Sequence, residues 1–141
     1  MKTTKTHQVF KKLQLANEQI RILEIQALTE FFKENPNLKS IYLSHEEQYN
    51  DSEHYMATTI TEINEVELPE AIFDSSDLIP YGENEASDEW KSCFMALEMK
   101  QKDVEVIIDI LSSFNESFLQ SLPEVLERTA YVKSEPKLKA R

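Results

Sequence analysis

The chain has 141 residues, a formal net charge of −11 and a single cysteine, Cys93. This length matches one domain that folds without disulfides, and one thiol excludes an intrachain disulfide and a cysteine-based zinc site. No uncharged run approaches the ~18 residues of a membrane span, and no apolar stretch follows the N-terminal lysines as in a signal peptide. We therefore expect a cytoplasmic protein that is not processed.

The first predicted element is a helix over residues 9–35. Its main apolar stripe steps by three or four residues, which is the helical period: Leu13, Ala16, Ile20, Leu23, Ala27 and Phe31. Further apolar residues widen the stripe: Ile22, Ile25, Leu28 and Phe32. This width predicts a helix buried on more than one side. Asn35 and Pro36 end it, because a residue before proline avoids the α region.

Two strands are predicted next, over residues 38–44 and 55–63, because both segments are rich in β-branched and aromatic residues. Residues 45–54 between them have the Asn-Asp-Ser composition of a turn, so the pair predicts a hairpin. Val66 and Leu68 extend the second strand or begin a third, before Pro69 stops it. Residues 69–86, with Pro69, Pro80 and the only glycine, Gly82, predict an irregular surface loop.

The C-terminal part predicts helices. Ser87 is a suitable N-cap, and a long helix is expected from residue 88 to about 114, although residues 104–111 also fit a strand. Ser121 and Glu124 have the spacing of a capping box, which predicts a last helix ending near residue 132. The order predicts an α+β fold: a small antiparallel sheet, either a hairpin or three strands, covered by the N-terminal helix and the C-terminal helices. We expect one domain over residues 1–141, with mobile basic tails at 1–8 and 133–141.

Several catalytic motifs are absent from the sequence. With one glycine, the chain cannot contain the phosphate-binding loops of nucleotide-binding proteins or the nucleophile elbow of hydrolases. HExxH, CxxC and the calcium-binding loop are also missing. We therefore predict a binding protein rather than an enzyme, and no cofactor. Cys93 is expected to be a buried core residue, as are the aromatic residues at helical spacing.

The charge distribution is the strongest functional signal. No Lys or Arg occurs between Lys39 and Lys91, and this gap holds fourteen acidic residues. Most acidic surfaces only aid solubility, but acidic surfaces also steer association with cationic partners. We expect the partner to bind through this acidic block, residues 45–89, and the predicted partner-binding residues are Glu46, Glu47, Asp51, Glu53, Glu62, Glu65, Glu67, Glu70, Asp74 and Asp77. We expect an inhibitor or neutralising protein, of immunity, antitoxin or nucleic-acid-mimic type, that binds a basic toxin, effector or nucleic-acid-binding enzyme.

Two alternatives remain open from the sequence. One is a chaperone-like adaptor that holds a client protein on apolar helix surface. The other is a small metal-binding protein, in which His45 and His54 face each other across the base of the hairpin and, with a carboxylate, bind zinc or iron. The basic ends favour solubilising tails over direct binding of nucleic acid. Alternatively, the basic ends fold back onto the acidic block or contact a neighbouring subunit. The second alternative is compatible with a homodimer.

Overall fold

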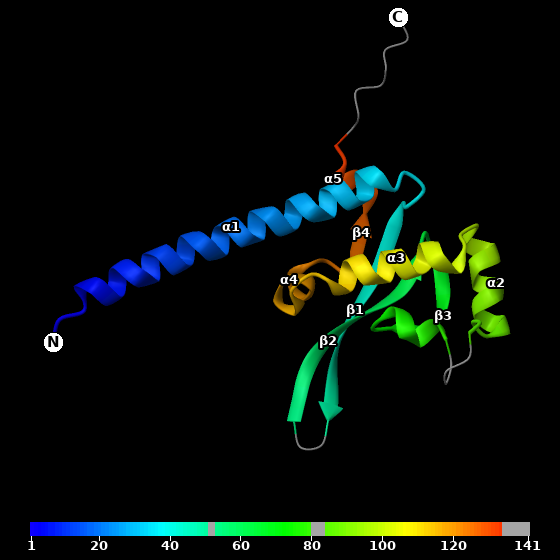
Figure 1. Ribbon diagram of the computed structural model, residues 1–141, viewed down its shortest axis with the longest axis horizontal. Helices are drawn as coiled ribbons and strands as arrows, with labels where there is room; N and C mark the ends of the chain where they lie inside the picture. Colours follow the sequence, from blue (N-terminus) through cyan, green and yellow to red (C-terminus); the bar gives the residue numbers. More distant parts are fainter. Residues whose placement is uncertain (51–52, 80–83, 134–141) are drawn as a thin grey trace, which may run out of the picture.

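A four-stranded antiparallel sheet with the strand order β3-β2-β1-β4 lies at the centre of the protein. The computed structural model describes the backbone of residues 1–50, 53–79 and 84–133, and their side chains except those of 48–50 and 53–55. Together with the helices, this sheet confirms the predicted α+β fold. Figure 1 shows the long N-terminal helix at one side and α3 crossing over the strands.

The elements follow one another as α1 (Thr4–Glu34), β1 (Ser40–Asn50), β2 (Glu53–Ile63), β3 (Val66–Ile72), the short 3-10 helix η1 (Ser75–Leu78), α2 (Asp88–Leu97), α3 (Gln101–Ser112), α4 (Glu116–Ser121), β4 (Val125–Glu127) and α5 (Arg128–Tyr131). The first helix and the two strands after it were predicted in this order. The predicted tail at residues 1–8 is helical from Thr4 onward, and residues 134–141 of the other tail lie outside the described part.

One face of the sheet forms the core. In β1, Ile41 and Leu43 are buried, whereas Tyr42 and Ser44 between them are partly exposed. This alternation follows from the two-residue period of a strand. The buried face packs with the apolar side of α3, which contributes Val104, Ile107, Ile108 and Leu111 to the same cluster. The opposite face carries Tyr42 and Ser44, which are partly exposed, and we call it the exposed face of the sheet.

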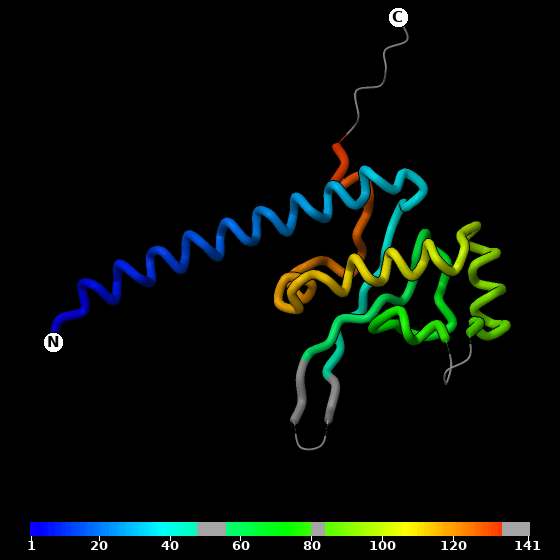
Figure 2. The backbone as a smooth tube through the Cα atoms, in the orientation of Figure 1, coloured from blue at the N-terminus to red at the C-terminus, as the bar shows by residue number. Residues whose placement is uncertain are grey.

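The predicted turn over residues 45–54 is wrong for most of its length. β1 and β2 stay paired out to Asn50 and Glu53, while β4 pairs with β1 only over Ser40–Tyr42 and β3 pairs with β2 only from Ile60 onward. The outer halves of β1 and β2 therefore form a two-stranded ribbon that projects from the body (Figure 1), and Figure 2 shows the two strands leaving the body side by side. We call residues 43–50 and 53–59 the ribbon.

Pro69 does not stop the third strand, because β3 continues to Ile72. β3 is an edge strand, and an edge position accepts proline since its missing N–H breaks no ladder bond on the solvent side. A two-residue turn, Asn64 and Glu65, joins β2 to β3. Both residues have positive φ, 51° and 65°, as a type I′ hairpin turn requires.

The predicted long helix from 88 to 114 is two helices. α2 ends at Leu97, and Glu98 takes a left-handed conformation with φ 59°, so the chain changes direction before α3 begins. α2 then packs on β3, while α3 packs its own apolar face against the buried face of the sheet. One straight helix could not place both apolar faces in the core. Residues 104–111, which also fitted a strand, are helical.

The predicted last helix is also wrong. Ser121 ends α4 rather than starting a helix, and the chain then extends into β4. β4 pairs with β1, where Leu126 lies opposite Ile41 and both are fully buried. Up to residue 133, where the described part ends, only the short helix α5 follows. The strand forms because the edge of β1 offers backbone partners, and a local capping pattern cannot reveal that edge.

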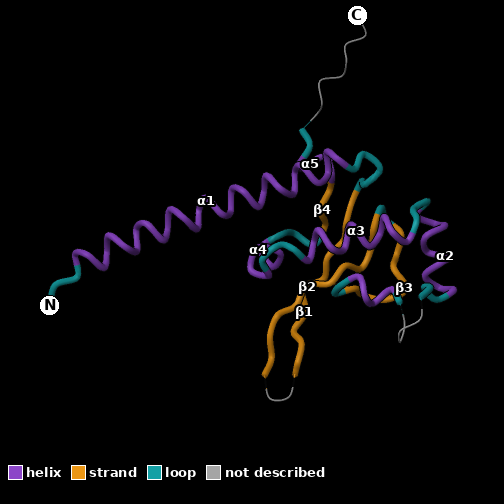
Figure 3. The backbone as a smooth tube through the Cα atoms, in the orientation of Figure 1, coloured by secondary structure: helices purple, strands orange, loops and turns teal. Residues whose placement is uncertain are grey.

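α1 meets the body only near its C-terminal end. Its buried residues are Leu28, Phe31 and Phe32, and residues 1–23 are all exposed. The expectation that this helix is buried on more than one side is therefore wrong. Figure 3 shows α1 reaching away from the sheet and the other helices. Among the described residues, no helix combines the length and apolar character needed to cross a membrane.

Candidate protein-binding surfaces

Two predicted acidic residues lie directly side by side on the exposed face of the sheet. Tyr42 pairs with Glu62 across β1 and β2, and Glu62 pairs with Glu67 across β2 and β3. Directly paired residues place their Cβ atoms about 5 Å apart on the same face. Glu67 is exposed and Glu62 is partly buried. The row Tyr42, Glu62 and Glu67, which we call the acidic row, is therefore a two-carboxylate surface with an aromatic neighbour.

Two more predicted residues lie near this row. Glu46 follows Tyr42 and Ser44 on the same side of β1 by strand alternation, and its Oε1 accepts a hydrogen bond from Ser44 Oγ at 3.0 Å. Glu65 is exposed in the turn that joins the strands of Glu62 and Glu67. The structure thus brings four predicted acids, Glu46, Glu62, Glu65 and Glu67, to the exposed face or to the turn beside it.

The two predicted aspartates have a structural role. Asp74 caps η1 by accepting from the Ser76 amide at 2.8 Å. Asp77 Oδ2 accepts from the amides of Phe73 and Asp74 at 2.8 and 3.3 Å. Because backbone amides donate hydrogen bonds to these carboxylates, both aspartates stabilise the local turn around η1. Asp74 and Asp77 have the spacing of a capping box, so the sequence already contained a signal for this helix start.

The remaining predicted acids are distributed elsewhere. Glu70 is exposed on β3, and Glu47 is exposed on β1 on the side opposite Glu46. Glu53 begins β2, but its side chain lies outside the described part, as does all of Asp51. The acidic segment is therefore spread over more than one side, and the acidic row is the part in which carboxylates are directly paired.

His45 and His54 do not face each other. His45 pairs with Thr58, and His54 pairs with Tyr49, so the two histidines lie four positions apart along the ribbon, about 13 Å. Both ring nitrogens of His45 are in hydrogen bonds, to Thr58 Oγ1 at 2.9 Å and to the Leu122 carbonyl at 3.1 Å. The carbonyl can only accept, so Nε2 carries the proton and donates. This arrangement removes the geometry on which the proposed metal site depended.

No group of three or more His, Cys, Asp or Glu side chains is placed to hold a metal ion in the described part of the chain. Cys93 is buried on α2, as predicted. Burial raises the pKa of the Cys93 thiol, because removal from water disfavours the thiolate. The neutral thiol is the unreactive form.

A cavity of about 310 Å³ lies between the sheet and α3, lined mainly by apolar side chains such as Leu43, Ile60 and Ile108. Its lining carboxylate, Glu116, accepts a hydrogen bond from the Thr58 amide at 2.9 Å. That contact ties α4 to the ribbon. The Glu116 carboxylate is therefore held by the Thr58 amide, and the rest of the cavity lining is mainly apolar.

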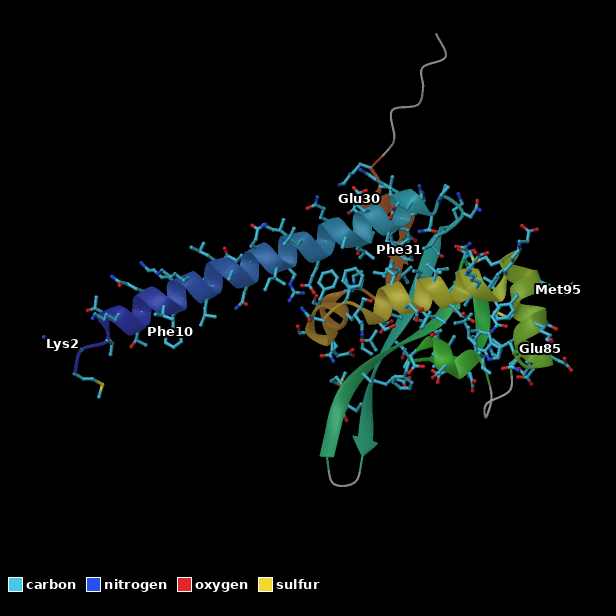
Figure 4. The ribbon with its side chains drawn as sticks, viewed as in Figure 1. Lys2, Phe10, Glu30, Phe31, Glu85 and Met95 are labelled. Atoms are coloured by element: carbon cyan, nitrogen blue, oxygen red, sulfur yellow. The ribbon has the colours of Figure 1, made fainter. Side chains whose placement is uncertain are left out.

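α1 presents the second candidate surface, which the prediction missed because its apolar stripe was assigned to the core. Its large exposed apolar residues are Val9, Phe10, Leu13, Leu15, Ile20, Ile22, Leu23 and Ile25, each at least 41% exposed. Figure 4 shows Phe10 among side chains that stand clear of the body, whereas Phe31 lies where α1 meets it. A folded monomer rarely leaves so many large apolar residues together in water.

A groove of about 440 Å³ continues this surface at the base of α1. It runs between α1 and the C-terminal end of α3, and its lining includes Ile20, Leu23, Ala27, Phe31, Ile110 and Phe114. Arg21 joins α1 to α4, with its guanidinium 5.2 Å from the centre of the Phe118 ring and Nη1 donating to Ser121 Oγ at 3.0 Å. The groove is apolar and open to solvent along α1.

Comparison with known proteins gives no relatives. No protein-family model matches the sequence, no curated protein is similar to it, and no solved structure matches the fold.

Proposed function

We propose that this protein is an acidic protein-binding module that inhibits or neutralises a basic protein partner, and that the acidic row is the centre of its binding site. The observation that supports this function is the direct pairing of Glu62 with Glu67. Like charges directly opposite each other destabilise a sheet. The sequence offers no Lys or Arg between Lys39 and Lys91 to compensate them.

A cationic partner would relieve this repulsion. When a Lys or Arg of the partner enters between Glu62 and Glu67, the unfavourable pair becomes two favourable contacts, so part of the attraction arises only on binding. Tyr42 adds an aromatic face beside the two carboxylates, and such a face suits arginine in particular. The partner we expect is a basic toxin, effector or nucleic-acid-binding enzyme, with the carboxylates in place of phosphates.

The test is capture of the partner by charge-matched variants. The tagged protein is incubated with nuclease-treated lysate of its host, and captured proteins are identified at low and high salt. The site variant is Glu62→Lys/Glu67→Lys. The control is Glu89→Lys/Asp109→Lys, which changes the net charge equally at exposed positions on α2 and α3. Circular dichroism confirms that both variants fold.

The proposal expects a basic protein that the wild type and the control capture, that is lost at high salt, and that the site variant does not capture. If the control variant loses the partner equally, overall charge rather than the acidic row carries binding. If the site variant captures the partner as well as the wild type does, the proposal is wrong.

A second candidate, a chaperone-like adaptor, is favoured by one observation: the exposed apolar surface of α1 and its groove. An adaptor would hold its client through apolar contacts, which salt does not screen. A captured protein that survives high salt and that the charge variants still bind would support the adaptor function in place of the inhibitor.

A further inference from the structure

The exposed apolar residues of α1 include a strict heptad pattern. Seven residues alternate in steps of three and four, the spacing of a coiled-coil contact: Thr6, Val9, Leu13, Ala16, Ile20, Leu23 and Ala27. We call this set the α1 seam. Its four large members are 46–56% exposed, so the side chains that a coiled coil would bury face solvent.

In the described part of the chain, the seam is left open to solvent: Ile20, Leu23 and Ala27 line the open groove, and the other seam residues lie N-terminal to it. α1 is also poorly able to stand alone. Most helix stability in proteins comes from packing of an apolar face, and the contacts of α1 with the body begin at Arg21. Its first turn has no side-chain cap and no acidic residue, and it carries Lys5, which opposes the helix dipole. Contact along the seam would supply the missing stabilisation.

The charge of α1 determines the orientation of a matching helix. Its N-terminal part holds Lys5, Lys11 and Lys12 and no acid, with Lys2 just before it, whereas its C-terminal part holds Glu18, Glu24, Glu30 and Glu34 against Arg21 and Lys33. Parallel pairing of two copies would place lysines beside lysines and bring two acidic bodies to the same end. Antiparallel pairing places the basic part of each helix beside the acidic part of the other.

An antiparallel register centred near Glu18 also matches the sizes of the seam residues. It places Val9 opposite Ala27, Leu13 opposite Leu23 and Ala16 opposite Ile20 of the second copy. In two of these three layers a small alanine faces a larger residue, and in the third two leucines meet; facing large and small residues interdigitate well in helical cores. Each of these layers occurs twice, as a two-fold axis requires.

We propose that two copies of this chain pair through antiparallel α1 seams. In this dimer, the N-terminal turns of one α1 lie in the groove of the other copy. Val9 and Phe10 would then meet the apolar lining formed by Ala27, Phe31 and Phe114. The proposal rests on α1 and its groove, and it does not depend on the function of the acidic row.

The available surface is large enough for such a dimer. The chain exposes 10372 Å², against roughly 7,600 Å² for a compact monomer of this mass. A standard interface covers about 800 Å² on each partner, and residues 4–27 alone give a helical strip about 36 Å long.

The first experiment measures mass in solution by size-exclusion chromatography with light scattering. The seam variant is Leu13→Gln/Leu23→Gln, and the matched control is Leu15→Gln/Ile22→Gln, which removes two apolar residues that lie off the seam and are somewhat more exposed. Glutamine keeps the helix propensity of leucine. The wild type and control should have twice the chain mass of 16.5 kDa, and the seam variant should have that mass once, with reduced helicity by circular dichroism.

A wild-type monomer at about 100 μM, well above micromolar affinity, would overturn the proposal, as would a control variant that dissociates as fully as the seam variant. A wild-type monomer that binds another protein through the seam residues would also overturn the proposal and would assign the seam to a client protein. Because the substituted side chains are exposed in the monomer, loss of the dimer is separable from unfolding of the body, which near-ultraviolet circular dichroism reports.

The second experiment tests orientation by disulfide formation in a Cys93→Ala background. Chains with Val9→Cys are mixed with chains with Ala27→Cys and oxidised. Antiparallel pairing predicts a disulfide between the two different chains and none between identical ones. Disulfides between identical chains at position 9 would show parallel pairing and refute the register.

Discussion

Replacement of Glu67 by lysine should stabilise the folded protein while it removes binding of a basic partner. Glu67 lies directly opposite Glu62 on the exposed face of the sheet. A cross-strand pair of charged residues changes the stability of a sheet by about 0.2–1 kcal/mol: opposite charges stabilise it and like charges destabilise it. Changing a repulsive pair into an attractive one should therefore raise the free energy of unfolding by about 1 kcal/mol, after allowance for screening at a solvent-exposed site.

Urea and thermal denaturation measure this change. For a chain of this size, 1 kcal/mol corresponds to about 3 °C in Tm. Glu70→Lys on the same strand changes the net charge equally without a directly paired carboxylate in the described register, so the difference between the two variants isolates the pair. The difference should shrink in 1 M salt, where the Debye length falls to ~3 Å.

A double-mutant cycle with Glu62→Gln completes the test. Once Glu62 is neutral, Glu67→Lys should lose most of its advantage over Glu70→Lys, because no carboxylate remains opposite position 67. If Glu67→Lys destabilises the protein, or stabilises it equally with Glu62 neutralised, the two carboxylates do not interact as the strand register implies. The acidic row would then lose its energetic distinction from the rest of the acidic surface.

Three further outcomes are expected. Glu65→Gly and Glu98→Gly should each stabilise the protein by about 0.5–1 kcal/mol in urea denaturation, because both residues have positive φ that glycine adopts without strain. Native Cys93 should react with a thiol reagent much more slowly than in urea. Since burial raises its folded-state pKa, the contribution of Cys93 to the free energy of unfolding should be constant below about pH 8.5 and fall above it, because the thiol ionises first in the unfolded chain. Arg21→Ala should lower the free energy of unfolding by about 0.5–1 kcal/mol and lower Tm slightly, because it removes the contact with the Phe118 ring.

Elements that depend on local pattern could be predicted from the sequence. The α+β class, α1, β1 and β2 follow from apolar periodicity and β-branched composition. The N-cap at Ser87 is confirmed, with its Oγ accepting from the Trp90 amide at 3.4 Å. These features need only neighbouring residues, so short-range stereochemistry fixes them.

Features that depend on distant partners could not be predicted in the same way. The capping pattern at Ser121 competes with strand pairing, and pairing with β1 wins because Leu126 becomes fully buried opposite Ile41. Likewise, the break at Glu98 serves two apolar faces that must reach the same core from different directions. Neither outcome is visible until the sheet exists.

For the candidate surfaces, the sequence determined the amount of acidic charge and the apolar period of α1, and the tertiary structure decided where each of them lies. Strand register places Glu62 beside Glu67, whereas Asp74 and Asp77 are taken up by backbone amides. The α1 stripe has the same periodicity whether a core or a second chain covers it. Only the arrangement of the other elements shows that the core of this chain ends near Leu28 and leaves the rest of the stripe exposed.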